Sequence, residues 1–152
     1  MSVVAHFFVV VGGSKFHDRL AHFFIDIYKY DERIYQSALE NRKTAISRIK
    51  PDFVLTRAEE YEVPSDVNRC YFFNPFSVEI LHKVMARILE SWYESPREVF
   101  LFFYYPADEF LAYLMTVDEL EFYDEIECDD LFEGNDPRER IMIFQLQDYP
   151  FD

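Results

Sequence analysis

Side chains that could act as nucleophiles or bind a metal are few in this sequence. There are two cysteines, Cys70 and Cys128, and they form neither a zinc-binding pattern nor a disulfide framework. The four histidines make no ligand pattern with an acid or a cysteine, and the spacing of His17 and His22 is poor for one metal ion on a helix. No Ser-His-Asp or Cys-His arrangement stands out. We therefore predict no metal site and two reduced thiols that are buried in the core.

Asn74-Pro75-Phe76 is a stronger candidate for contact with a ligand. It follows an aromatic run at residues 69–73, and a helical pattern begins at Ser77, which can cap it. Proline has no N–H to donate to a sheet, so Asn74-Pro75 is expected to end a strand. Two interpretations stay open. In the first, the turn closes the strand and Phe76 is a plug of the core; in the second, Asn74 and Phe76 contact a substrate or cofactor.

Two further segments could bind an anion. Gly12-Gly13, followed by Ser14, ends an apolar strand. Such a loop before a helix can cradle an anion, because residues without Cβ allow close backbone approach. An ordinary loop is the alternative. The segment Asp136–Arg140 is expected to be a turn with Arg138 or Arg140 paired to local carboxylates, and anion binding is the alternative.

The elements that position these residues are clearest in the later part of the chain. Apolar runs predict strands at 69–73, 98–105, 120–127 and 140–146, and helical periodicity predicts helices at 77–95 and 107–116. Helices between apolar strands imply right-handed crossovers and a parallel sheet. The last two strands have only a loop between them, which suits an antiparallel hairpin. We expect one sheet whose last strand is reversed.

The earlier part is harder to interpret. An apolar run predicts a strand at 3–11, and residues 16–30 and 32–49 have helical periodicity. A short strand is expected at 52–56. The length of 152 residues, with 50% hydrophobic and 19% aromatic residues, predicts one domain over 1–152 with a substantial core.

Charge and hydropathy limit the possible partners. The formal net charge is −14, and the stretch from Asp118 to Asp136 holds ten acids and no base. Such a surface repels phosphate backbones, so nucleic acid is an unlikely partner. Two interpretations of the acids stay open: they attract a cationic partner, or they form a solvated face that keeps the domain soluble. The sequence lacks a membrane-spanning apolar run and a signal-peptide pattern, which predicts a cytoplasmic protein with no membrane contact.

The later part of the chain resembles the later half of a class I S-adenosylmethionine-dependent methyltransferase. The likeness is carried by the string "DFVLTRAEEYEVPSDVNRCYFFNPFS", the helix and apolar strand that follow it, and "DPRERIMIFQL". The likeness is closest to small bacterial members with an "FFNPF" strand end. It covers roughly residues 52–147 and rests on the order of elements more than on any one motif. It implies an α/β fold with a Rossmann-like methyltransferase sheet, mostly parallel with an antiparallel last strand.

The resemblance also implies a cofactor and a methyl acceptor. S-adenosylmethionine would bind across the carboxyl ends of the strands, with Gly12 and Gly13 near its methionine part and Arg57-Ala58 beside the adenine. Asn74, Pro75 and Phe76 would hold the acceptor, an unknown small molecule or protein, although relatives have a second proline here. No catalytic base is required, because methyl transfer depends mostly on positioning.

The sequence departs from the family in its cofactor-binding half. Gly12-Gly13 has no third glycine at family spacing, the acid that holds the ribose cannot be placed, and Arg57 stands where relatives have Asp. In an alternative alignment, residues 2–8 match the helix after the glycine loop. The family domain would then be incomplete at the N-terminus, with residues 9–50 diverged. We predict a methyltransferase-like protein with weak or absent cofactor binding and uncertain activity; the alternative is a non-catalytic remnant of the fold or an interaction module.

Overall fold

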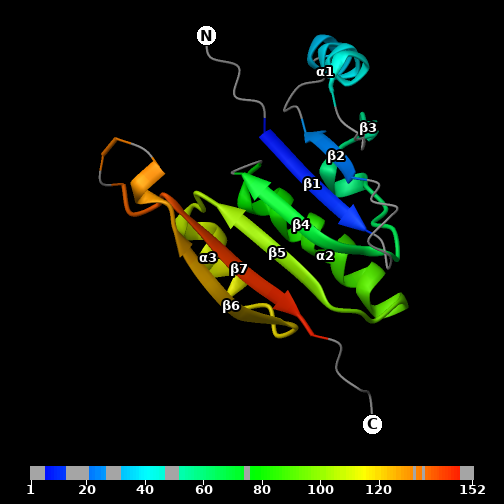
Figure 1. Ribbon diagram of the computed structural model, residues 1–152. Helices are drawn as coiled ribbons and strands as arrows, with labels where there is room; N and C mark the ends of the chain where they lie inside the picture. The colour runs from blue at the N-terminus through cyan, green and yellow to red at the C-terminus, as the bar shows by residue number, and fades with distance from the viewer. Residues whose placement is uncertain are drawn as a thin grey trace.

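The computed structural model describes residues 6–12, 21–26, 32–46, 52–73, 76–131, 133–134 and 136–147. Within them the chain has an α/β fold with one mixed sheet in the order β3-β2-β1-β4-β5-β7-β6 (Figure 1). The strands are β1 His6–Gly12, β2 Ala21–Asp26, β3 Asp52–Val54, β4 Val67–Phe73, β5 Val99–Tyr104, β6 Leu120–Glu127 and β7 Arg140–Leu146. The helices are α1 Glu32–Thr44, α2 Val78–Glu94 and α3 Asp108–Leu114, with short 3-10 turns η1 Ala58–Glu60 and η2 Asp129–Leu131.

The later half of the sheet is arranged as the sequence predicts. Strands β4 and β5 are parallel, and β7 is antiparallel to both of its neighbours, β5 and β6. Strand β6 therefore runs in the same direction as β5, with α3 between them in the chain. The predicted sheet with a reversed last strand is confirmed for these four strands.

The expectation of a mostly parallel sheet is wrong. Among the described strands, β1 is antiparallel to both β2 and β4, so parallel pairing is limited to β2 with β3 and β4 with β5. The predicted helix at 16–30 is also wrong where the chain is described, because Ala21–Asp26 forms β2. These six residues are rich in aromatic and β-branched side chains, which favour a strand once a neighbouring strand is available. The alternative helix at 2–8 is wrong for its described residues, since residues 6–8 belong to β1.

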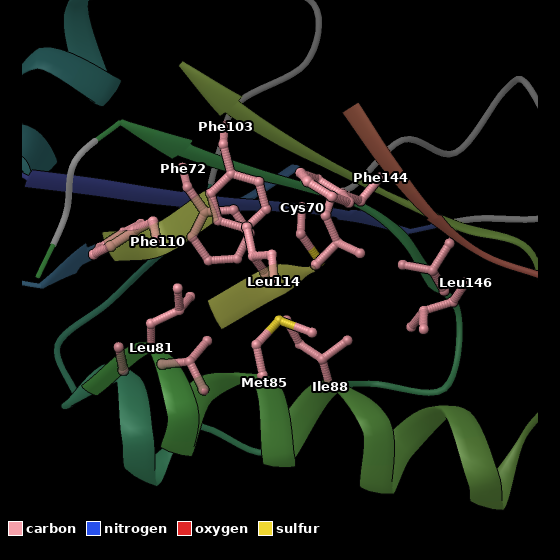
Figure 2. Close-up of a cluster of buried hydrophobic side chains, with 14 of the residues drawn as sticks. Cys70, Phe72, Leu81, Met85, Ile88, Phe103, Phe110, Leu114, Phe144 and Leu146 are labelled. Carbon is pink, nitrogen blue, oxygen red and sulfur yellow. The ribbon is translucent and has the colours of Figure 1, made fainter. Parts of the chain in front are cut away.

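The core lies between the sheet and two helices that cover the same face. Figure 1 shows α2 and α3 behind β4, β5 and β7, and Figure 2 shows Leu81, Met85 and Ile88 of α2 pointing at the strands. On the sheet side, Phe72 and Phe103 are stacked, with ring centroids 4.4 Å apart. Stacked aromatic pairs contribute about 0.5–1.5 kcal/mol beyond the area that they bury. Both cysteines are free and buried as predicted, and burial raises the pKa of Cys70 to about 12.

The opposite face of the sheet is aromatic but is less completely buried. Tyr71, Phe100, Phe102 and Tyr104 are half-buried there, and Phe73 is 36% exposed. We expected helices over both faces of β4. Among the described helices, α2 and α3 lie on one face, while α1 lies toward the β3 side of the sheet (Figure 1). No described helix is long and apolar enough to cross a membrane.

Arg97 ties the start of β4 to the end of α2. Its guanidinium donates to the backbone oxygens of Val67 at 2.6 Å and Pro64 at 3.2 Å. It also donates to the backbone oxygens of Ser91 and Ser95 and to the Ser91 hydroxyl. One side chain thereby satisfies several acceptors that would otherwise need water.

Replacing Phe72 with alanine tests the core. Phe72 is fully buried, so Phe72→Ala should lower the free energy of unfolding by roughly 3–5 kcal/mol through lost burial and cavity formation. The neighbouring residue Phe73 provides the control. Because Phe73 is partly exposed, Phe73→Ala should lower the free energy of unfolding by about 1 kcal/mol or less. Urea unfolding followed by circular dichroism measures both values. Equal losses for the two variants would contradict the assignment of Phe72 to the core.

Candidate functional site

The candidate site lies where the parallel strands end. Phe73, the last residue of β4, is paired with Tyr104, the last residue of β5. Tyr104 in turn pairs with Ile141 of β7, which also pairs with Ile126 near the end of β6. The carboxyl ends of β4, β5 and β6 therefore share one edge, which we call the carboxyl edge. In open α/β sheets this edge is the usual place for ligands.

Tyr105 has an unusual backbone at this edge. Its φ angle is 51°, in the left-handed region, and among the described residues it is the only non-glycine residue with positive φ. Its N–H donates to the Arg140 backbone oxygen at 3.0 Å, which holds the turn between β5 and Pro106 against β7. A backbone of this kind costs about 1–3 kcal/mol and persists where the surrounding structure enforces it, often at functional sites. Tyr105 is therefore the first residue to consider for function.

Two tyrosines at the edge bind acids from the loop between β6 and β7. The Tyr105 hydroxyl donates to Asp136 Oδ2 at 2.5 Å, and the Tyr104 hydroxyl donates to Glu139 Oε2 at 2.6 Å. Arg138 lies over the Tyr105 ring, 4.8 Å from its centroid, and its Nε and Nη2 donate to the two oxygens of Asp136. The predicted turn at 136–140, with arginines paired to local carboxylates, is confirmed.

These contacts fix the protonation states of the edge. The hydrogen bonds from Arg138 and Tyr105 hold the pKa of Asp136 well below its usual range. Burial and the Glu139 hydrogen bond raise the pKa of Tyr104, and the Asp136 hydrogen bond raises that of Tyr105. Near neutral pH both tyrosines are thus neutral donors and Asp136 is an anion. They are suited to binding and positioning a ligand rather than to moving protons.

An acidic hollow adjoins the tyrosines. It has a volume of about 260 Å³ and lies between the ends of β6 and β7. Its lining consists of Glu125, Glu127, Asp129, Asp136, Pro137, Glu139 and Arg140. Arg140 Nη1 pairs with Glu125 at 3.1 Å, while its buried Nε has no partner. Within the described part of the chain, no three His, Cys, Asp or Glu side chains are grouped to hold a metal ion.

Gly12, which the sequence assigned to the cofactor, lies away from the carboxyl edge. Because β1 runs against β4, Gly12 lies opposite Val67, at the amino end of β4. Phe73 is six residues farther along β4, about 20 Å at roughly 3.4 Å per residue. Gly12 is therefore far from the carboxyl edge, and Gly13 lies outside the described residues. Gly12 and the last residue of β4, Phe73, thus lie at opposite edges of the sheet.

The other predicted cofactor residues follow β3. Arg57 is exposed, and its Nη1 is 3.9 Å from Glu60 Oε1. Ala58 is buried in the core cluster, where η1 packs against α2. Arg57 thus has a local acid as its neighbour, and the Ala58 side chain is not at the surface. Their role beside an adenine stays a prediction.

The predicted acceptor-binding turn is described only in part. Asn74 and Pro75 lie outside the described residues. Phe76 is 7% exposed, and its ring contacts Phe72 edge-on at 6.2 Å and Phe110 at 6.4 Å. This geometry favours the interpretation of Phe76 as a plug of the core. A ring buried in this way is not available to stack on a substrate.

Sequence reasoning missed Tyr104 and Tyr105. Their signal was the Tyr-Tyr-Pro sequence directly after an apolar strand, since the end of such a strand lies at the carboxyl edge. Nothing in the sequence pairs them with Asp136 and Glu139, because that pairing depends on β7 lying beside β5. Comparisons with protein-family models, with curated proteins and with solved structures find no match to this chain.

Titration of Asp136 tests the network. A lowered folded-state pKa means that the group stabilises the fold above its unfolded value of about 3.9 and loses this effect as the pH falls through the folded value. Carbon-13 NMR of the carboxyl group should give a midpoint below 3.9. Arg138→Gln should raise the midpoint most, because Arg138 is the larger cause, and Tyr105→Phe should raise it less. Unchanged midpoints in both variants would contradict these contacts.

Proposed function

We propose that this chain is a class I S-adenosylmethionine-dependent methyltransferase-like protein that retains the acceptor half of the fold. The observation that carries the proposal is the strand arrangement. Leaving β7 aside, the order β3-β2-β1-β4-β5-β6 is that of the doubly wound nucleotide-binding fold. Strand β7 lies antiparallel between β5 and β6, as the reversed last strand of the methyltransferase sheet does. This supports the resemblance that the sequence suggested for residues 52–147.

The carboxyl edge supports an acceptor site. It combines two neutral phenols, Tyr104 and Tyr105, whose hydroxyls donate to Glu139 and Asp136 and whose oxygens can still accept a hydrogen bond, with the acids of the adjoining hollow. Methyl transfer from a sulfonium needs orientation and exclusion of water more than it needs a strong base. The lowered pKa of Asp136 and the raised pKa values of Tyr104 and Tyr105 are compatible with this chemistry. The acceptor is a small molecule or a protein side chain.

The cofactor half supports only weak binding. In a doubly wound sheet β1 is parallel to β4, and the loop after β1 reaches the cofactor at the carboxyl edge. Here β1 is reversed and Gly12 lies at the other edge. If S-adenosylmethionine binds, the described residues nearest to the usual place are those at the ends of β4 and β5.

A non-catalytic protein with this fold is the second candidate. The reversal of β1 is the observation that favours it, because it removes the glycine segment from the carboxyl edge. Such a protein would use the surfaces of its sheet to bind a partner and would not catalyse methyl transfer. The two candidates differ in whether the cofactor binds.

Calorimetric titration with S-adenosylhomocysteine separates the two candidates. We expect a dissociation constant weaker than about 100 μM, or no measurable heat, because Gly12 lies at the edge of the sheet opposite the carboxyl ends of β4 and β5. A low-micromolar constant would contradict this expectation. Gly12→Val would then show whether the glycine segment is the cause.

Substitution of Asn74 tests the acceptor turn. If its side chain faces a ligand site, Asn74→Ala should lower the free energy of unfolding by about 0.5 kcal/mol or less. In an active enzyme the same change should sharply reduce methyl transfer to any acceptor found. Urea unfolding measures the first effect and transfer of a radiolabelled methyl group measures the second. A large loss of stability would mean that the amide holds the turn together, which would remove the support for a binding role.

A further inference from the structure

Strand β6 is an edge strand that is unusually open. It forms one end of the described sheet and pairs with β7 alone among the described strands. It is eight residues long, and every residue from Glu121 to Glu127 is exposed. Its outer backbone groups are therefore positioned to pair with another extended chain. Proteins usually shield such an edge with a covering segment, with proline or with lysine.

Three large apolar side chains lie along this edge. Phe122 is 49% exposed, Tyr123 is 57% exposed and Ile126 is 47% exposed. Each of the two rings has one contact with the sheet: Phe122 with Phe144 at 6.1 Å and Tyr123 with Phe100 at 4.9 Å. The remaining surface of these side chains is open to solvent. It offers apolar contact to a segment that pairs with β6.

The charge of the edge indicates which segment would fit. Glu121, Asp124, Glu125 and Glu127 lie on β6 itself, and Asp129 and Asp130 follow it directly. Arg140 pairs with one of these acids, Glu125. Gln147 also donates to Glu121. The edge therefore keeps a strong excess of negative charge.

The bulge in β6 does not close the edge. The register shifts between Phe122 and Asp124, which leaves Tyr123 as the extra residue. Pairing with β7 then continues without interruption from Asp124 to Glu127. A bulge can twist an edge away from a partner, but here it interrupts only one point of the strand. The segment after it remains regular.

We propose that β6 is a docking edge for an extended basic segment of a partner protein. The segment would add a strand beside β6, with main-chain hydrogen bonds to the open edge. Its lysine or arginine side chains would meet the acids of β6, and its apolar side chains would lie on Phe122 at one face of the sheet and on Tyr123 and Ile126 at the other. This inference does not depend on methyl transfer or on cofactor binding.

Charge complementarity favours this occupant over the alternatives. A second copy of the chain, paired edge to edge, would place the acids of one β6 against those of the other, which is destabilising. A small inorganic cation would use neither the open backbone nor the apolar side chains. A basic strand would use the open backbone, the apolar side chains and the acids of β6. Its encounter with a chain of net charge −14 is also favoured electrostatically.

NMR titration of the full chain, labelled with nitrogen-15, tests the proposal. The probe is a capped synthetic peptide in which lysine alternates with valine. Its length of about eight residues is within the usual range for a β-strand. We expect saturable amide shifts centred on β6 and β7, and an affinity that falls as salt is added. No saturable shift up to about 1 mM peptide, or shifts centred elsewhere, would overturn the proposal.

Two controls separate strand addition from general attraction. The same peptide with alternate backbone nitrogens methylated keeps its charge but cannot form the ladder, so it should bind at least about tenfold more weakly. Equal binding of the two peptides would overturn strand addition. This comparison uses the unaltered protein, so it does not depend on the folding of a variant.

Matched charge variants locate the site. Asp124→Lys with Glu127→Lys should weaken binding at least about tenfold. Glu62→Lys with Glu94→Lys, which changes the net charge equally on the loop before β4 and at the end of α2, should have less than about a threefold effect. If both double variants weakened peptide binding equally, the peptide would respond only to the net charge of the protein, and the assignment of the site to β6 would be wrong. Sedimentation of the protein without peptide tests whether a second copy of the chain occupies the edge. Self-association that is lost on Asp124→Lys would assign the edge to that second copy and overturn the proposal.

Discussion

The parallel pairing of β4 with β5 is the constraint on which the candidate site depends. It places Phe72 directly beside Phe103 in the register, and the two rings stack under α2 and α3. The next pair along is Phe73 with Tyr104, which ends both strands at the same level. A shift of one residue would move every side chain of one strand to the opposite face of the sheet. The buried aromatic pair therefore fixes where the carboxyl edge lies and which tyrosines it presents.

The two ends of β4 are held by different kinds of interaction. At the amino end, Arg97 joins Val67 and Pro64 to the last turn of α2 through hydrogen bonds with backbone oxygens. At the carboxyl end, Phe76 turns back into the core and contacts Phe72 and Phe110. Polar contacts thus hold the end that lies away from the proposed site, and apolar packing holds the end that borders it. The tyrosines at the carboxyl edge are held instead by the acids of the loop before β7.

The sequence predicted the later half of the fold well, because each element there has a clear period and a clear stop. One apolar stripe at helical spacing predicted the helix over residues 77–95, and one apolar run predicted the strand after it. The earlier half failed at Ala21–Asp26, which satisfies helical spacing and strand composition equally well. Local pattern cannot choose between the two, since the choice depends on whether β1 is present to pair with it.

The candidate site was less predictable than the fold for a similar reason. Asn74-Pro75-Phe76 attracted attention because its residue types suggest ligand contact, yet Phe76 is part of the core. Tyr105 gave little signal, although its backbone is the strained one. The partners of Tyr105 come from a loop about 30 residues away, and only the position of β7 beside β5 brings them together. Strand order, which no local motif encodes, decides which side chains share the carboxyl edge.

Charge and shape have to be considered together on the β6 side of the sheet. An open strand with exposed aromatic side chains would ordinarily favour aggregation, since it can pair with any other open strand. The acids of β6 change this outcome, because they act against a second copy and leave a basic strand as the favoured neighbour. The same acids border the hollow beside Tyr104 and Tyr105, so a partner bound along β6 would reach the carboxyl edge at Glu127. One negative surface thereby serves both to keep copies of the chain apart and to direct a cationic partner toward the strand ends.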